Sequence, residues 1–197
     1  MKKPGSEGSP VVLTIGHSTR TLEAFISLLV EHDVQKVVDI RTIPRSKHNP
    51  QFNREDLPNS LKATGIGYVH MPGLGGLRHS LPNSLNTGWR SLTFRGFADY
   101  MQENEFIEYL EVLIELAKTE RVVLMCAEAV PWRCHRSLIA DALSIRGVRV
   151  EHILSPTSLQ THKITPWAKV DGINITYPPE EQQSDRKRLL SKVRRSK

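Results

Sequence analysis

Cysteine is scarce in this sequence, and that scarcity excludes a class of folds. The 197 residues include two cysteines, too few for the disulfide scaffolds that hold small secreted domains together. No stretch approaches the roughly 18 consecutive apolar residues that a membrane-spanning helix needs. Lys2 and Lys3 have no apolar run behind them, which argues against a signal peptide and predicts a flexible leader over residues 1–10. We therefore expect a cytoplasmic protein with reduced thiols and no membrane partner.

Most of the chain lacks a net charge of either sign, because its basic and acidic residues nearly balance. The formal net charge is +6, and residues 180–197 supply +4 of it, from seven basic and three acidic side chains. A basic segment can bind nucleic acid without sequence preference, whereas blocks of like charge are usually solvated and disordered. We expect a disordered basic tail, and nucleic acid stays open as a partner.

Short β-branched runs alternate with helical patterns through most of the chain. Strands are predicted at residues 11–15, 36–41, 66–71, 121–126 and 148–154. Helices are predicted at residues 22–29, 55–63, 97–118 with a break near Asn104, and 134–146. The alternation predicts one α/β domain over residues 11–155, with a mostly parallel sheet of about five strands and helices on both faces. Residues 156–179 would be a C-terminal extension, in which 173–177 could add an edge strand.

Residues 73–95 form a long connection that begins with a glycine-rich segment. The segment follows a strand without opening a helix, so it matches neither a Walker loop nor a dinucleotide-binding fingerprint. Connections of this length are uncommon in compact domains and often carry function. We expect a flap from which Arg78 reaches the site.

Chemically capable side chains follow the ends of the predicted strands. Ligands of open parallel sheets bind outside the carboxyl ends of the strands. We therefore expect one edge of the sheet to collect His17, Ser18, Asp39, Arg41, His70, Cys126 and Glu128.

These residues belong to motifs that resemble a known family. The motifs are Gly16-His17-Ser18, Asp39-Ile40-Arg41, Pro44-Arg45-Ser46, Gly65-Ile66-Gly67-Tyr68, Leu74-Gly75-Gly76, Cys126-Ala127-Glu128 and Cys134-His135-Arg136. In order and spacing they resemble the bacterial and archaeal domain-of-unknown-function family numbered 488, over roughly residues 11–155. The resemblance implies an α/β fold and a pocket, and it supplies no reaction.

The two cysteines are candidate nucleophiles. Cys126 ends a predicted strand and Cys134 opens a predicted helix, where the helix dipole and nearby basic side chains favour a thiolate. Either could serve a hydrolase or transferase, and either could instead be a small buried core residue. Cysteine phosphatases and sulfurtransferases place five residues between cysteine and arginine; six separate Cys126 from Arg133, so the likeness is an analogy.

The remaining polar residues divide into proton-transfer and anion-binding candidates. His17 and His70 are candidate general bases, and Glu128 is a candidate general acid or ion-pair partner of an arginine. The residues expected to bind an anionic substrate are Ser18, Asp39, Arg41, Arg45, Arg78, His135 and Arg136. Asp39 would orient Arg41 or His17, and solvated loop charge is the alternative for Arg45.

A metal site is the main competing interpretation. Cysteine and histidine offer the sulfur and nitrogen ligands that zinc prefers. Seven residues separate Cys126 from Cys134, which does not fit the usual zinc knuckle, and the adjacency of Cys134 and His135 makes joint ligation awkward. We therefore assign no metal and name no cofactor, while a Cys126–Cys134 redox pair stays open.

The sequence thus predicts an enzyme that depends on a cysteine in a cationic pocket. Its substrate would be anionic, bearing a phosphate, sulfur or carboxylate group. One alternative is a nucleic-acid-binding or processing module. The basic tail and the cationic segment 41–54 support this alternative. The other is a non-catalytic anion-sensing or interaction protein. No oligomeric state is predicted.

Overall fold

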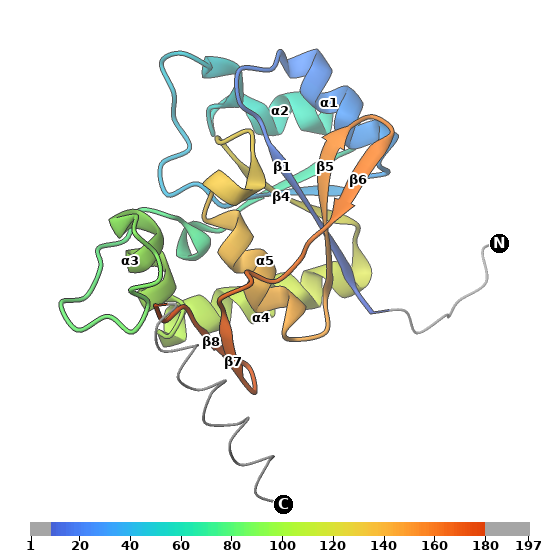
Figure 1. Ribbon diagram of the computed structural model, residues 1–197. Coiled ribbons are helices and arrows are strands. Elements are labelled where there is room, and N and C mark those ends of the chain that lie inside the picture. Colours follow the sequence, from blue (N-terminus) through green and yellow to red (C-terminus); the bar gives the residue numbers. More distant parts are fainter. Residues whose placement is uncertain (1–8, 180–197) are drawn as a thin grey trace, which may run out of the picture.

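A six-stranded sheet forms the centre of the protein, as seen in a computed structural model that describes residues 9–179. The strand order is β3-β2-β4-β1-β5-β6 (Figure 1). The strands are β1 (Val11–Gly16), β2 (Lys36–Asp39), β3 (Gly67–His70), β4 (Val122–Cys126), β5 (Arg149–Ser155) and β6 (Ser158–Thr161). The first five strands are parallel, and β6 pairs antiparallel with β5. The predicted α/β architecture is confirmed, with β6 added to the five predicted strands.

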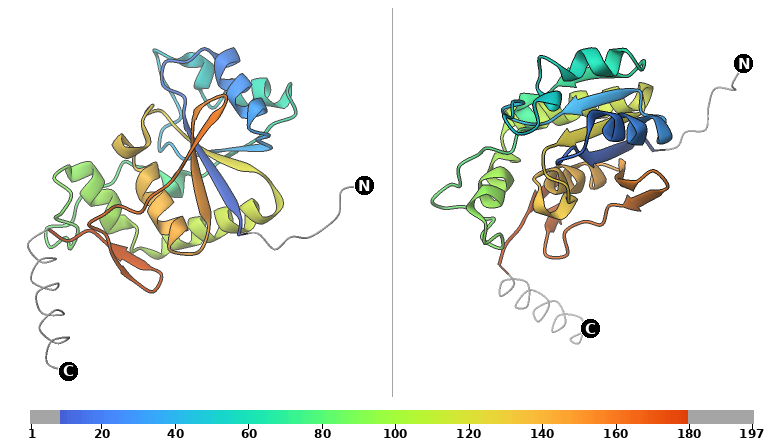
Figure 2. Two further views of the ribbon diagram at one scale, coloured as in Figure 1. Left: turned by 45° about the vertical axis from the view of Figure 1, so that its right-hand side comes forward. Right: turned by 90° about the horizontal axis from the view of Figure 1, so that it is seen from above.

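Helices cover both faces of the sheet (Figure 2). The helices are α1 (Leu22–Glu31), α2 (Leu57–Lys62), α3 (Leu92–Tyr100), α4 (Asn104–Thr119) and α5 (Arg136–Ser144). α1 and α2 pack on one face, while α3, α4 and α5 pack on the other. Side chains alternate along a strand. β1 therefore directs Leu13 and Ile15 into the core under α1 and α2, and Val12 into the core under α3, α4 and α5.

The break predicted near Asn104 is confirmed, since α3 and α4 are separate helices. α3 begins at Leu92, however, inside the stretch predicted as a connection. Ser91 caps this helix, because its side chain accepts a hydrogen bond from the backbone N–H of Phe94. The flap prediction therefore applies to a shorter connection than expected.

The helix predicted to begin at Cys134 begins later, so that prediction is wrong. Pro131–Arg133 form a 3₁₀ turn, η3, and α5 starts at Arg136 with His135 as its N-cap. The backbone N–H of Cys134 donates to the carbonyl of Pro131. Two further 3₁₀ turns, η1 (Pro50–Phe52) and η2 (Pro72–Leu74), also begin with proline, whose fixed φ suits the first position of a helical turn.

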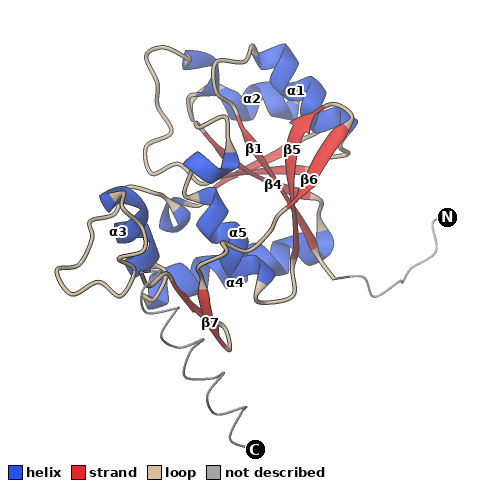
Figure 3. Ribbon diagram, viewed as in Figure 1, coloured by secondary structure: helices blue, strands red, loops and turns tan. Residues whose placement is uncertain are grey.

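The predicted edge strand at residues 173–177 exists but has another partner. β8 (Asn174–Thr176) pairs with β7 (Lys169–Asp171) in a separate hairpin (Figure 3). The basic tail predicted at 180–197 and most of the predicted leader lie outside the described residues. None of the helices between residues 9 and 179 has both the length and the apolar character needed to span a bilayer.

Candidate functional site

A cavity of about 650 Å³ opens at the carboxyl edge of the sheet. It lies where β1 and β4 meet, and the chain leaves these two strands in opposite directions: β1 leads through α1 to β2, and β4 leads through α5 to β5. Such a switch point is where open α/β sheets bind ligands. The predicted residues that line the cavity are His17, Ser18, Arg41, Arg45, Cys126, Glu128, Cys134 and His135.

The two cysteines lie together in the wall of this cavity. Both are nearly buried, with exposed fractions of 8% for Cys126 and 4% for Cys134. A hydrogen bond from the Cys134 thiol lowers the pKa of Cys126, and a hydrogen bond from the backbone N–H of Glu128 acts in the same direction. Burial and the neighbouring Cys126 sulfur raise the pKa of Cys134. The two shifts run in opposite directions, so Cys126 is the more acidic thiol of the pair.

His135 joins the cysteines through its Nδ1 atom. That atom lies 3.6 Å from Cys134 Sγ, while Nε2 lies 3.3 Å from the carbonyl oxygen of Ile40. A carbonyl only accepts, so Nε2 carries the ring proton and the Nδ1 lone pair of the neutral imidazole faces the cysteines. Gly76 makes room for this ring, because a Cβ there would lie 2.5 Å from Nδ1.

Arg136 is buried under the loop that follows Cys126 and is not part of the cavity wall. Its exposed fraction is 1%, and its guanidinium donates to the carbonyls of Glu128 at 2.5 Å and Ala129 at 2.7 Å. The loop also presses on the end of β1, where a Cβ at Gly16 would overlap the Glu128 carbonyl. Arg136 thus holds the loop in place, and the predicted ion pair with the Glu128 carboxylate is replaced by a bond to its backbone.

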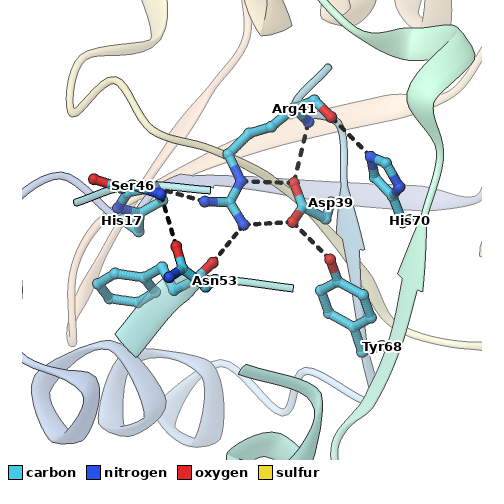
Figure 4. A network of polar contacts seen from close by, with 8 residues as sticks. His17, Asp39, Arg41, Ser46, Asn53, Tyr68 and His70 are labelled. Atoms are coloured by element: carbon cyan, nitrogen blue, oxygen red, sulfur yellow. Dashed lines mark hydrogen bonds and ion pairs between the residues drawn. The ribbon is translucent and has the colours of Figure 1, made fainter. Parts of the chain in front are cut away.

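Asp39 and Arg41 form a second buried cluster at the end of β2 (Figure 4). Arg41 Nε and Nη2 donate to the two carboxylate oxygens of Asp39, at 2.9 and 2.6 Å. Nη2 also donates to the carbonyl of Phe52, and the Tyr68 hydroxyl donates to Asp39 at 2.7 Å. Burial opposes the charge on Arg41, but the bonds to Asp39 outweigh it and raise its pKa. Asp39 therefore orients Arg41, one of the two roles predicted for it.

His17 has both ring nitrogens engaged, and its Nε2 contacts Arg41 of this cluster (Figure 4). Nδ1 lies 2.9 Å from the carbonyl of Ser18 and Nε2 lies 3.2 Å from Arg41 Nη1. The carbonyl can only accept and the guanidinium can only donate, which assigns the Nδ1–H tautomer. Burial lowers the pKa of His17, and the positive charge of Arg41 acts in the same direction. The neutral ring has no free lone pair, which speaks against the predicted role as general base.

Besides Asp39 and Arg136, two further predicted residues, His70 and Arg78, do not line the cavity. His70 Nε2–H donates to the backbone carbonyl of Arg41 at 2.8 Å, so His70 supports the end of β2. Arg78 stacks on the ring of Tyr100, at 3.5 Å from the ring centroid, and lies 3.9 Å from Glu105. The prediction that Arg78 reaches the pocket is therefore not met. Arg133, which is not among the predicted site residues, does line the cavity.

Comparison with known proteins gives one result. A family model described as domain of unknown function DUF488 matches residues 21–143. The chain belongs to the DUF488 family. No curated protein and no solved structure matches it. The matched DUF488 segment contains both cysteines, His135, Arg136 and the Asp39–Arg41 pair, and it ends before β5.

A chain of polar contacts that sequence reasoning missed extends from Asp141, inside the DUF488 match, to residues outside the match. Thr14 Oγ1 lies 2.7 Å from His152 Nδ1, His152 Nε2 lies 3.0 Å from His162 Nδ1, and His162 Nε2 lies 2.8 Å from Asp141. Asp141 also accepts bonds from the backbone N–H and hydroxyl of Thr165 and from the hydroxyl of Tyr177. The chain ties α5 to β1, β5 and the segment after β6. The sequence signal was an aspartate on the apolar face of a predicted helix.

Proposed function

We propose that this DUF488 protein is a hydrolase or transferase that uses Cys126 as its nucleophile on a small anionic substrate. The observation that carries the proposal is the thiol pair in the cavity wall: Cys134 donates to Cys126, and His135 stands beside both. A thiolate, rather than a thiol, is the reactive species. Cys126 ends a strand of the central sheet, so its position is set by a rigid element.

The loop after Cys126 provides a second argument that the substrate is anionic. Arg136 draws the carbonyls of Glu128 and Ala129 toward the protein interior. In a trans peptide the carbonyl and the following N–H point in opposite directions, and the described chain has no cis peptide bonds. The N–H groups of Ala129 and Val130 therefore point away from Arg136. Backbone N–H groups arranged in this way suit an oxyanion that develops during the reaction.

Two arginine side chains at the cavity rim add positive charge to that of the backbone N–H groups. Arg133 is exposed and Arg45 is three-quarters exposed, with Arg45 only loosely paired to Glu55 at 3.8 Å. Long, exposed guanidinium groups can reach a phosphate or carboxylate and bind it in a bidentate manner. Arg41 contributes positive charge as well, although its guanidinium is already committed to Asp39 and Phe52.

The chemistry follows from these positions. The Cys126 thiolate attacks the electrophilic phosphorus, sulfur or carbonyl carbon of the substrate, and the bond from that atom to the leaving group breaks. The Cys134 thiol supplies the proton to the leaving group. In the second step His135 Nδ1, 3.6 Å from Cys134 Sγ, takes a proton from the attacking water or acceptor and passes it to that sulfur. Water or an acceptor then takes the group from Cys126 and regenerates the thiolate.

Covalent trapping tests the proposal. The protein is incubated separately with thiosulfate, p-nitrophenyl phosphate and succinyl thioester, and its intact mass and peptide masses are measured. We expect one donor to leave its sulfur, phosphoryl or acyl group on Cys126 and this adduct to be absent from Cys126→Ser. Alkylation of the free protein provides the independent measure: Cys126 should titrate well below the ordinary thiol pKa of about 8.5. No adduct from any donor, with a Cys126 that titrates in the ordinary range, would sink the nucleophile.

A further inference from the structure

The side chains of Cys126, Cys134 and His135 bring three potential metal ligands together. Their ligating atoms all lie within 4.8 Å of one another, and no other cluster of this kind occurs within residues 9–179. Cys134 Sγ and His135 Nδ1 are 3.6 Å apart. In tetrahedral zinc sites with Zn–S of about 2.3 Å and Zn–N of about 2.0 Å, a sulfur and a nitrogen ligand are separated by roughly 3.5 Å. We propose that Cys126, Cys134 and His135 bind a zinc-like thiophilic divalent cation, and that the bound ion masks the Cys126 thiolate.

Backbone conformation explains how two adjacent residues can share one ion. Cys134 is extended, with φ −129° and ψ 144°, whereas His135 is helical, with φ −55° and ψ −18°. The change from extended to helical geometry turns both side chains to the same side of the chain. The adjacency of Cys134 and His135, awkward in the sequence, is therefore no obstacle to joint ligation in the folded protein.

The surroundings of His135 are those of a metal-binding histidine. Its Nε2–H points at the Ile40 carbonyl, which leaves Nδ1 as the free ligand atom. Histidine ligands in metal sites nearly always donate their second ring N–H to a carbonyl or carboxylate. The ring is also held by Phe97, in an edge-on contact with centroids 5.0 Å apart, and by the close approach of Gly76.

The charge balance of the site accommodates the ion. Binding displaces the proton of the Cys134 thiol to solvent, and two thiolates then neutralise a divalent cation. The backbone N–H of Arg136 donates a hydrogen bond to the Cys134 sulfur. All three ligands line the cavity. Three protein ligands beside an open cavity match the ligand number of catalytic zinc sites, in which solvent or substrate completes the shell.

The zinc site rests on ligand geometry and does not depend on the proposed reaction. The two ideas meet at Cys126, because a sulfur that coordinates zinc is not free to attack a substrate. Zinc would then act as a reversible inhibitor of the thiol chemistry, and its removal would restore the nucleophile.

Zinc titration of the reduced, full-length protein tests the site. We expect one Zn²⁺ per chain by calorimetry and by elemental analysis after dialysis, with release of a proton that calorimetry detects as a dependence on buffer ionisation enthalpy. Cys126→Ser, Cys134→Ser and His135→Gln should each weaken binding by at least about tenfold. His79→Gln is the matched control, since His79 is exposed and lies outside the cavity wall, and it should bind like the wild type.

Cobalt(II) provides a spectroscopic readout of the same site. We expect a thiolate-to-cobalt charge-transfer band that either cysteine variant weakens or removes. Zinc should also slow alkylation of Cys126, and a chelator should restore it. Absence of stoichiometric zinc, or equal zinc affinity in all three ligand variants, would overturn the site. Those results leave the alkylation of zinc-free protein untouched, so the nucleophile is judged separately.

Discussion

At the scale of single residues, the two thiols divide their roles through one hydrogen bond. Cys134 stabilises the charge on Cys126, and the backbone N–H of Glu128 adds to the effect. Replacing Cys134 by Ala removes the donor, whereas Cys134→Ser keeps a hydroxyl in its place. We expect Cys134→Ala to raise the pKa of Cys126 by about one to two units, the worth of a hydrogen bond to a charged group, and Cys134→Ser to raise it less. The measurement is the rate of Cys126 alkylation against pH, and identical profiles for both variants and the wild type would contradict it.

Arg136 makes a second prediction at this scale. Within residues 9–179 its Nε atom has no hydrogen-bond partner, and its other nitrogens hold two backbone carbonyls. Arg136→Lys keeps the positive charge but cannot bond both Glu128 and Ala129 in the fork geometry. We expect a loss of about 1 to 3 kcal/mol in the free energy of unfolding, and slower alkylation of Cys126 as the loop loosens. Arg149→Lys is the control, because Arg149 is exposed. Equal urea midpoints for the two variants would show that Arg136 does not hold the loop.

At the scale of secondary-structure elements, the site was largely predictable where strands carry it. Asp39, Cys126 and His17 were placed at one sheet edge from apolar runs and the rule for parallel sheets, and the structure puts all three there. The prediction placed Cys134 at the start of a helix, and this was wrong. The apolar periodicity of α5 shows which face of the helix is buried, but not at which residue the helix begins. Pro131 opens a 3₁₀ turn first, so Cys134 falls between the turn and the helix.

Tertiary hydrogen bonds were the part that sequence could not reveal. His152 lies inside a predicted strand and His162 lies in a polar stretch, and neither position carries a local signal. Their partners, Thr14 and Asp141, lie 138 and 21 residues away along the chain. Only the pairing of β5 with β1 and of β6 with β5 brings these groups together.

This polar chain predicts how stability depends on pH. Burial lowers the pKa of His152 to about 4, and the charges of His162 and Arg136 act in the same direction. Between pH 6.5 and 4 the unfolded chain therefore binds a proton that the folded protein excludes, so the free energy of unfolding falls as the pH falls. We expect His152 to account for a loss of about 2 kcal/mol between pH 7 and pH 5.

Urea unfolding of wild type and His152→Gln at these two pH values isolates the contribution. Glutamine does not titrate, so the variant should lose less stability on acidification, although it starts from a lower value at pH 7. The carboxylates that also titrate in this range are common to both proteins and cancel in the comparison. A variant with the same pH slope as the wild type would show that His152 is not the group excluded from protonation.

At the scale of the whole molecule, most of the net positive charge lies in the terminal segments and not in the part of the chain that forms the cavity. Residues 180–197 carry +4 and residues 1–8 carry +1, which leaves +1 of the total of +6 for the described body of the protein. The arginines of the body are largely committed to local partners: Arg41 to Asp39, Arg136 to the loop, and Arg78 to Tyr100. A body with so little net charge favours the proposed binding of a small anion in the cavity over an extended cationic surface.

Nucleic-acid binding, if the protein has it, should therefore depend on the terminal segment. Each phosphate that a basic side chain neutralises releases counterions and adds about 0.9 to the steepness with which log affinity falls against log salt. We expect full-length protein with its seven basic residues of 180–197 replaced by glutamine to lose duplex-DNA affinity at low salt and most of this salt dependence, while zinc binding and Cys126 alkylation stay unchanged. Fluorescence anisotropy over a salt series measures both proteins under the same conditions. Unchanged DNA affinity would move the determinant to the cationic segment 41–54, and with it the nucleic acid to the rim of the cysteine cavity, which Arg45 lines.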